Sequence, residues 1–162
     1  MSGKYDEVIQ AGVELVGAAG EKADLEILSL AAQVLIAVGN GYGFRLEMGY
    51  AGIFNMLCEA LSLSDEQVAQ VREALAVKNT RELKELLGSH GLEETAASRA
   101  LIALPSLFGG EEVLRQANSV FAGTGAEALL PLLRKRYEDA CTFLKKEQII
   151  LDLGLVQQNH YY

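Results

Sequence analysis

The stretch Ile149-Ile150-Leu151-Asp152-Leu153-Gly154-Leu155-Val156 is apolar apart from Asp152 and the small residue Gly154. A short run of this kind, rich in branched aliphatic residues, predicts a strand buried in the protein interior. We therefore expect the preceding part of the chain to supply the other strands and the helices of the same core.

Two segments further upstream predict the other strands. Residues 8–17 are rich in β-branched residues and end in glycine, which is typical of a strand. Residues 44–50 alternate large apolar side chains with Arg45, Glu47 and Gly49. This period of two predicts a strand with one face buried and the other exposed.

The segments between these strands predict helices. Residues 23–38 carry apolar side chains on more than one face, which predicts a helix packed deeply between other elements. Ser64 and Gln67 have the spacing of a capping box, and they predict a helix that ends near residue 76. Further helices are predicted at residues 53–61, 80–87 with Thr80 as its cap, 93–104, 111–121 and 126–146. Lys145 and Lys146 would lie at the C-terminal end of the last one.

The order of strand, helix, strand, several helices and strand predicts an α+β fold. We expect residues 1–50 and 147–162 to form a partial sheet domain. Residues 51–146 are long for a connection between strands, so they are expected to form a helical insertion subdomain of their own.

Composition narrows the classes of function. The chain has 162 residues and a formal net charge of -8, which disfavours binding to nucleic acid. Its longest apolar stretch, residues 25–38, is too short and too polar to span a membrane, and its first residues lack the apolar core of a secretory signal. Cys58 and Cys141 are far apart in the sequence, and we expect both to be buried free thiols. These features indicate a cytoplasmic protein.

The sequence offers little support for catalysis. Neither His90 nor His160, the two histidines, has a further ligand at metal-binding spacing, whereas a structural zinc needs about four ligands. No nucleophilic triad is recognisable either. We therefore predict no catalytic residue, no metal and no cofactor.

Gln10 and Glu14 are better candidates for a binding site. They lie four residues apart on the predicted strand of residues 8–17, so both side chains would point to the same face. An amide beside a carboxylate can hold an ammonium group and a polar side chain. On pattern alone, the favoured explanation for Gln10 and Glu14 is a solvated sheet face. Tyr161 and Tyr162 at the end of the chain fit an unpacked terminus equally well.

Four stretches of the chain resemble histidyl-tRNA synthetases and their paralogues. Residues 10–17 (QAGVELVG) resemble the end of the synthetase motif 2. Residues 152–156 (DLGLV), followed by Tyr161 and Tyr162, resemble the start of the histidine-specific motif. Residues 46–54 (LEMGYAGIF) and 103–110 (ALPSLFGG) are similar to the paralogues that regulate ATP phosphoribosyltransferase.

The resemblance implies a class II synthetase-like fold built on an antiparallel sheet. It implies a non-catalytic subunit that activates a short-form ATP phosphoribosyltransferase catalytic subunit, its partner in the first step of histidine biosynthesis, and makes it sensitive to histidine as effector. It also implies that histidine binds at Gln10, Glu14, Tyr161 and Tyr162.

Two departures from the synthetase pattern argue against aminoacylation. Gln157 stands where the synthetase motif has an arginine that acts on the activated carboxylate, and His160 replaces the aspartate before the tyrosines. Loss of one such charged group typically costs about 3 kcal/mol of transition-state stabilisation.

Two other functions compete with the regulatory one. The first is that of a diverged histidyl-tRNA synthetase, which would catalyse histidine-dependent pyrophosphate exchange. The second is a helical interaction domain without a ligand, in which Gln10 and Glu14 would have no role in regulation.

The resemblance also implies an internal fragment, either excised from a longer subunit or produced by a truncated gene. In the family, further strands precede the residues seen here and an ATP-binding motif follows them. Without these strands, sheet edges would be exposed, so we expect the chain to self-associate. Sedimentation over a wide concentration range measures this, and a clean monomer throughout would contradict it.

Overall fold

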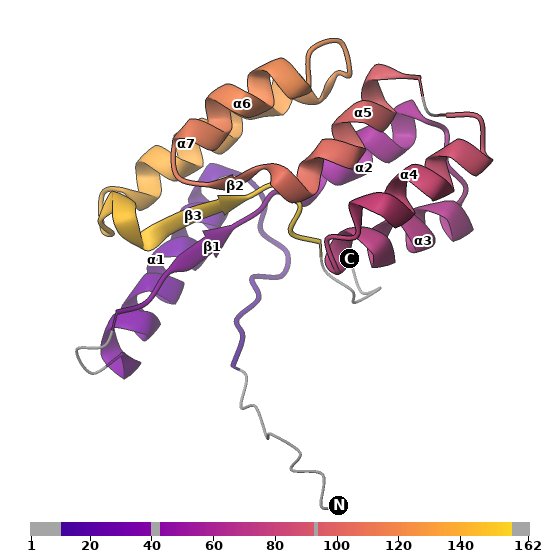
Figure 1. Cartoon of the computed structure of the whole chain (residues 1–162). Coiled ribbons are helices and arrows are strands. Elements are labelled where there is room, and N and C mark those ends of the chain that lie inside the picture. Colours follow the sequence, from indigo (N-terminus) through magenta and orange to yellow (C-terminus); the bar gives the residue numbers. More distant parts are fainter. Residues whose placement is uncertain (1–10, 40–42, 93, 157–162) are drawn as a thin grey trace, which may run out of the picture.

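A three-stranded sheet lies between two groups of helices (Figure 1). The structure is a computed structural model that describes residues 11–39, 43–92 and 94–156. Strand β3 (Ile149–Asp152) lies in the middle, with β1 (Leu46–Met48) parallel to it on one side and β2 (Phe108–Gly109) antiparallel on the other. The described sheet is therefore mixed and not purely antiparallel as expected, because β1 runs in the same direction as β3.

Helices surround this sheet and make up most of the fold. In chain order the α-helices are α1 (Glu21–Val38), α2 (Ala51–Ala60), α3 (Asp65–Ala76), α4 (Thr80–Ser89), α5 (Ala96–Ala103), α6 (Glu112–Val120) and α7 (Leu130–Ala140). Short 3-10 helices are η1 (Leu104–Ser106), η2 (Ala126–Leu129) and η3 (Lys146–Gln148). The predicted α+β content is thus confirmed.

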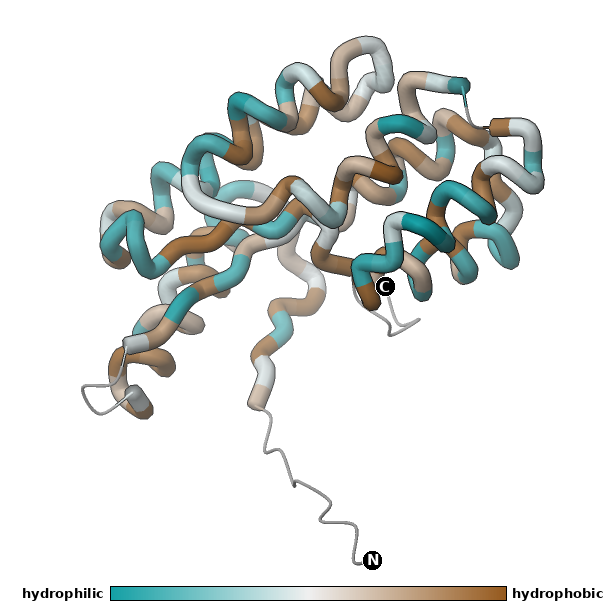
Figure 2. Tube along the Cα trace, in the orientation of Figure 1, coloured by the Kyte–Doolittle hydropathy of each residue, from teal (hydrophilic) through white to brown (hydrophobic). Residues whose placement is uncertain are grey.

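The middle strand behaves as its apolar sequence predicts. Ile149, Leu151 and Asp152 of β3 are buried, and Figure 2 shows β3 as an apolar strand beside helices whose outer turns are hydrophilic. The strand ends earlier than the predicted residue 156, because the Gly154 N–H donates to the Asp152 Oδ1 at 3.0 Å and turns the chain. A side chain at Gly154 would meet the Leu104 carbonyl oxygen at 3.0 Å, so glycine allows close packing there.

The strand predicted at residues 8–17 is not formed in its described part. Residues 11–17 are exposed and adopt neither helix nor strand, and Gly17 has a φ of 80°. A β-branched sequence becomes a strand only where backbone groups find a partner. No strand in the described ranges pairs with this segment.

Helix α1 forms where it was expected, but it is not deeply packed. Its main neighbour is α7, and Ala32 is its one buried residue. Val34, Ile36 and Val38 in its second half are 47%, 59% and 71% exposed. The expectation of burial between several elements is therefore wrong for the residues that the structure describes.

Local capping rules explain several helix boundaries. The predicted capping box is confirmed, because the Ser64 hydroxyl accepts from the Gln67 N–H and the Gln67 side chain accepts from the Ser64 N–H. Helix α4 is capped by Asn79 and not by Thr80, since the Asn79 Oδ1 accepts from the Glu82 N–H at 3.2 Å.

The long helix predicted at residues 126–146 is divided into three elements. Pro131 lies in the first turn of α7, where its missing N–H costs nothing. Thr142 then bonds back to the Asp139 carbonyl through its hydroxyl at 2.6 Å, after the helix has ended. Lys146 therefore does not cap α7; it pairs with Glu111 at 2.7 Å instead.

Both cysteines are free, as expected, and Cys58 is buried while Cys141 is half-buried. Burial raises the pKa of the Cys58 thiol to about 12, so it stays protonated near neutral pH. The expected boundary at residue 51 stays a prediction, although β2 comes from within residues 51–146 and pairs with β3.

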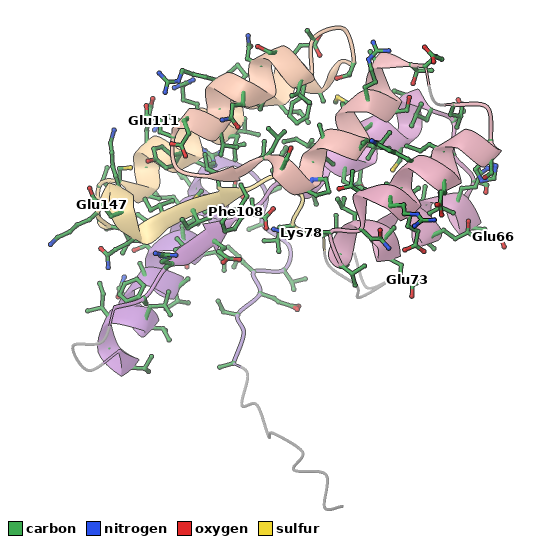
Figure 3. All side chains as sticks on the ribbon, in the orientation of Figure 1. Glu66, Glu73, Lys78, Phe108, Glu111 and Glu147 are labelled. Atoms are coloured by element: carbon green, nitrogen blue, oxygen red, sulfur yellow. The ribbon has the colours of Figure 1, made fainter. Side chains whose placement is uncertain are left out.

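One ion pair joins the helices to the sheet. The Lys78 ammonium, in the turn between α3 and α4, lies 2.8 Å from the buried carboxylate of Asp152 and 4.5 Å from the centre of the Phe108 ring. Figure 3 shows Lys78 beside Phe108 at this junction. The side chain of Asp152 is 3% exposed and that of Lys78 is 43% exposed, so Asp152 depends on a partner more than Lys78 does.

We expect Lys78→Met to lower the free energy of unfolding by roughly 1–3 kcal/mol, because it leaves a buried carboxylate without its cation. Adding Asp152→Asn should recover part of this loss, since the unpaired charge is then removed. Urea denaturation followed by circular dichroism measures both. The control is Lys84→Met, an exposed lysine of α4, and equal midpoints for Lys78→Met and Lys84→Met would contradict the assignment.

Candidate functional site

A groove of about 730 Å³ lies on the part of the chain that the structure describes. Its walls come from residues 13–16 and 18, the first turns of α1, the end of β1, the start of α2, and α7. Arg72 of α3 and residues 155–156 also line it. The groove therefore brings together segments that are far apart in the sequence, including both sides of the predicted domain division.

Polar side chains of both charges line this groove. They are Glu14, Asp24, Glu47, Tyr50, Asn55, Arg72 and Arg136. Apolar residues such as Leu28, Met48 and Phe54 fill the spaces between them. A mostly apolar hollow with a few polar groups is the usual form of a small-molecule site.

Arg136 is already neutralised by acids of α1 and α7. Its Nε donates to the Asp24 carboxylate at 2.8 Å, and its guanidinium also lies 3.5 Å from Asp139 and 3.8 Å from Glu21. The hydrogen bond to Asp24 raises the pKa of the Arg136 guanidinium above its ordinary value. Lys135 also pairs with Asp139 and Glu21. This cluster joins α1 to α7 and forms one wall of the groove.

Arg72 has a different environment. Its guanidinium carbon lies 5.3 Å from the centre of the Phe54 ring, within the range of a cation–π contact. No carboxylate of the described ranges lies within 4.0 Å of it, because Arg72 takes part in none of their salt bridges. Among the described residues, the groove thus contains one arginine that pairs with carboxylates and one that contacts an aromatic ring.

The sequence-predicted site is described only in part. Glu14 lines the groove and is exposed. Gln10, Tyr161 and Tyr162 lie outside the described residues, as do Gln157 and His160. The four-residue histidine site therefore remains a prediction, with one of its members located in a groove of suitable chemistry.

Other groove residues were missed from the sequence. Glu47, Tyr50 and Asn55 lie in or next to the family-like stretch of residues 46–54, which was a usable signal. Arg72 lies on an ordinary amphipathic helix, and nothing in its spacing distinguishes it from a solvated arginine.

The described part of the chain contains no group of three or more side chains suited to a metal ion. None of its helices has the length and apolarity needed to cross a membrane.

Comparison with solved structures identifies the class of fold. The chain is similar to a crystal structure described as an ATP phosphoribosyltransferase regulatory subunit/histidyl-tRNA synthetase from Bacillus halodurans, with a TM-score of 0.71 and 23% identity. The match covers 88% of this chain and 38% of that one. The fold is therefore the α+β, class II synthetase-like one. The family model for histidyl-tRNA synthetase matches residues 2–162, and the chain belongs to this family.

Curated relatives agree with this assignment. An ATP phosphoribosyltransferase regulatory subunit of Thermoanaerobacter pseudethanolicus is 35% identical over 160 residues, which are 99% of this chain and 42% of that protein. One from Moorella thermoacetica is 34% identical over 161 residues, with 99% and 41% covered. The chain thus spans about two fifths of the length of the relatives it matches.

We expect Arg136→Met to loosen the contact between α1 and α7, because Asp24 and Glu21 lose their buried cation. Amide hydrogen exchange in α1 should become several-fold faster, while α3 and α4 keep their protection. Arg134→Met is the control, since Arg134 is exposed and lies 3.9 Å from Glu111. Unchanged exchange in α1 would show that the cluster does not hold this helix.

Proposed function

We propose that this chain is part of a regulatory subunit that activates a short-form ATP phosphoribosyltransferase and makes it sensitive to histidine. The observation that most supports this proposal is the match, over 99% of the chain, to regulatory subunits of that enzyme. The first step of histidine biosynthesis would place the protein in the cytoplasm. A second copy of this chain and the catalytic subunit are its proposed partners.

The proposed effector site contains Gln10, Glu14, Tyr161 and Tyr162. Glu14 supports it, because this carboxylate lines the groove and has no cation within 4.0 Å in the ranges that the structure describes. A carboxylate in this state is available to an ammonium group of a ligand. The aromatic rings of Tyr161 and Tyr162 would suit a planar imidazole ring.

We further propose that the chain has no catalysis of its own. Gln157 replaces the arginine of the synthetase motif, and His160 replaces the aspartate before the tyrosines. Without that arginine, charge that develops on the amino acid carboxylate during adenylate formation would lack a stabilising cation. A site that retains a ligand but loses the catalytic charge is suited to sensing the ligand.

Activation of a catalytic subunit tests this function. Adding the full-length protein to a short-form ATP phosphoribosyltransferase should increase the rate of phosphoribosyl transfer to ATP, and histidine should reduce that rate. Glu14→Gln should preserve activation and weaken inhibition by histidine, because only the effector site is changed. No increase in phosphoribosyl transfer would refute the proposal.

The alternative of a diverged synthetase is favoured by the family model, whose description is that of histidyl-tRNA synthetase. Histidine-dependent pyrophosphate exchange by the full-length protein distinguishes the two functions. An exchange rate well above that of a no-enzyme control would support the synthetase.

A further inference from the structure

Some charged side chains in the groove form ion pairs with each other, whereas others have no charged partner among the described residues. Arg136 and Asp24 neutralise each other at 2.8 Å. Glu14, Glu47 and Arg72 also line the groove, and none of them has an oppositely charged side chain within 4.0 Å in the described part of the chain. Among the described residues, the groove therefore contains two carboxylates and one guanidinium that have no charged partner.

The Arg72 side chain is held in position before any ligand arrives. Phe54 is buried, with 2% of its surface exposed, so its ring is a fixed platform at 5.3 Å from the guanidinium carbon. Arg72 itself is half-buried. A guanidinium that contacts a ring through its face keeps its N–H donors free at the edge, and these donors fit a carboxylate with two parallel hydrogen bonds.

Asn55 provides a second polar group on the same wall. It follows Phe54 on α2, is exposed, and lines the groove together with Arg72. Its amide can donate to an oxygen that Arg72 also binds. The positive part of the groove is thus formed by α2 and α3, whereas Glu14 comes from the segment before α1.

We propose that Arg72, assisted by Asn55, binds the α-carboxylate of a zwitterionic amino acid in this groove. The inference rests on the proposed function for the choice of histidine as ligand. At neutral pH an amino acid carries one ammonium and one carboxylate, which matches the available Glu14 and Arg72. Gln157 adds weight to this assignment, because a neutral residue stands where the synthetase motif has its arginine.

This assignment would give the helical segment a direct role in sensing the ligand. Arg72 lies on α3, two residues after Gln70 and shortly before the turn that carries Lys78. Lys78 in turn is bonded to Asp152 at the end of β3. Contact between Arg72 and a ligand held by Glu14 would therefore join α3 to the segment before α1, in addition to the link between the α3–α4 turn and β3.

Comparison of two ligands tests the proposal. L-histidine has the carboxylate, and L-histidinol has a hydroxymethyl group in its place. We expect Arg72→Gln to weaken histidine binding by about tenfold or more, the usual effect of losing a charge-assisted hydrogen bond. The affinity for histidinol should stay within about twofold, since it never uses this charge. Isothermal titration of the full-length protein measures both affinities.

The matched control is Arg81→Gln, which removes an exposed arginine on α4 whose partner is Glu85 at 2.8 Å. It should change neither affinity. Arg72→Lys should restore part of the histidine affinity, because it returns the charge without the bidentate geometry.

The outcomes separate the two claims. If the wild-type protein does not bind histidine, the proposed function fails together with this inference. If the wild-type protein binds histidine and Arg72→Gln leaves its affinity unchanged, or weakens histidine and histidinol equally, the carboxylate assignment is wrong while the regulatory function stands.

Discussion

A buried carboxylate must keep a partner, and the Asp152 side chain determines much of how this molecule is joined. One of its oxygens accepts from the Gly154 N–H and the other lies 2.8 Å from the Lys78 ammonium. The first contact ends β3, and the second holds the α3–α4 turn against the sheet. Next to it, the Leu153 N–H donates to the Leu107 carbonyl at 3.0 Å. Sheet and helices therefore depend on one another, because separating them would leave the Asp152 carboxylate without its cation.

The groove results from this contact between the helices and the sheet. Arg72 and Phe54 reach it from the helices, whereas Met48 and Glu47 reach it from β1. The Arg136 cluster then holds α1 against α7 and closes another wall. A hollow built from such distant segments can respond to a ligand as one unit, which is compatible with the regulatory role proposed above. Its acids, and an arginine without a carboxylate partner among the described residues, favour a ligand with both charges.

Features with a local cause were predictable, and features that need a distant partner were not. The capping box of Ser64 and Gln67 formed as its spacing predicts, since both hydrogen bonds lie within one turn. The strand expected at residues 8–17 failed in its described part, because no described strand pairs with it. Glu14 was singled out because its segment resembles a family motif, and its role in histidine binding stays a prediction. Arg72 was missed as a groove residue, because an arginine on an amphipathic helix has no local signal.

By itself, the sequence determined the α+β class, the apolar middle strand, most helix positions and the family to which the chain belongs. These properties depend on periodicity, capping and short motifs, all of which act over a few residues. Tertiary structure alone decided that β1 runs parallel to β3, that Lys78 pairs with Asp152 across 74 residues, and that Arg72 enters the same groove as Glu14. The reason is that such contacts are chosen by the packing of the whole core, which no local pattern contains.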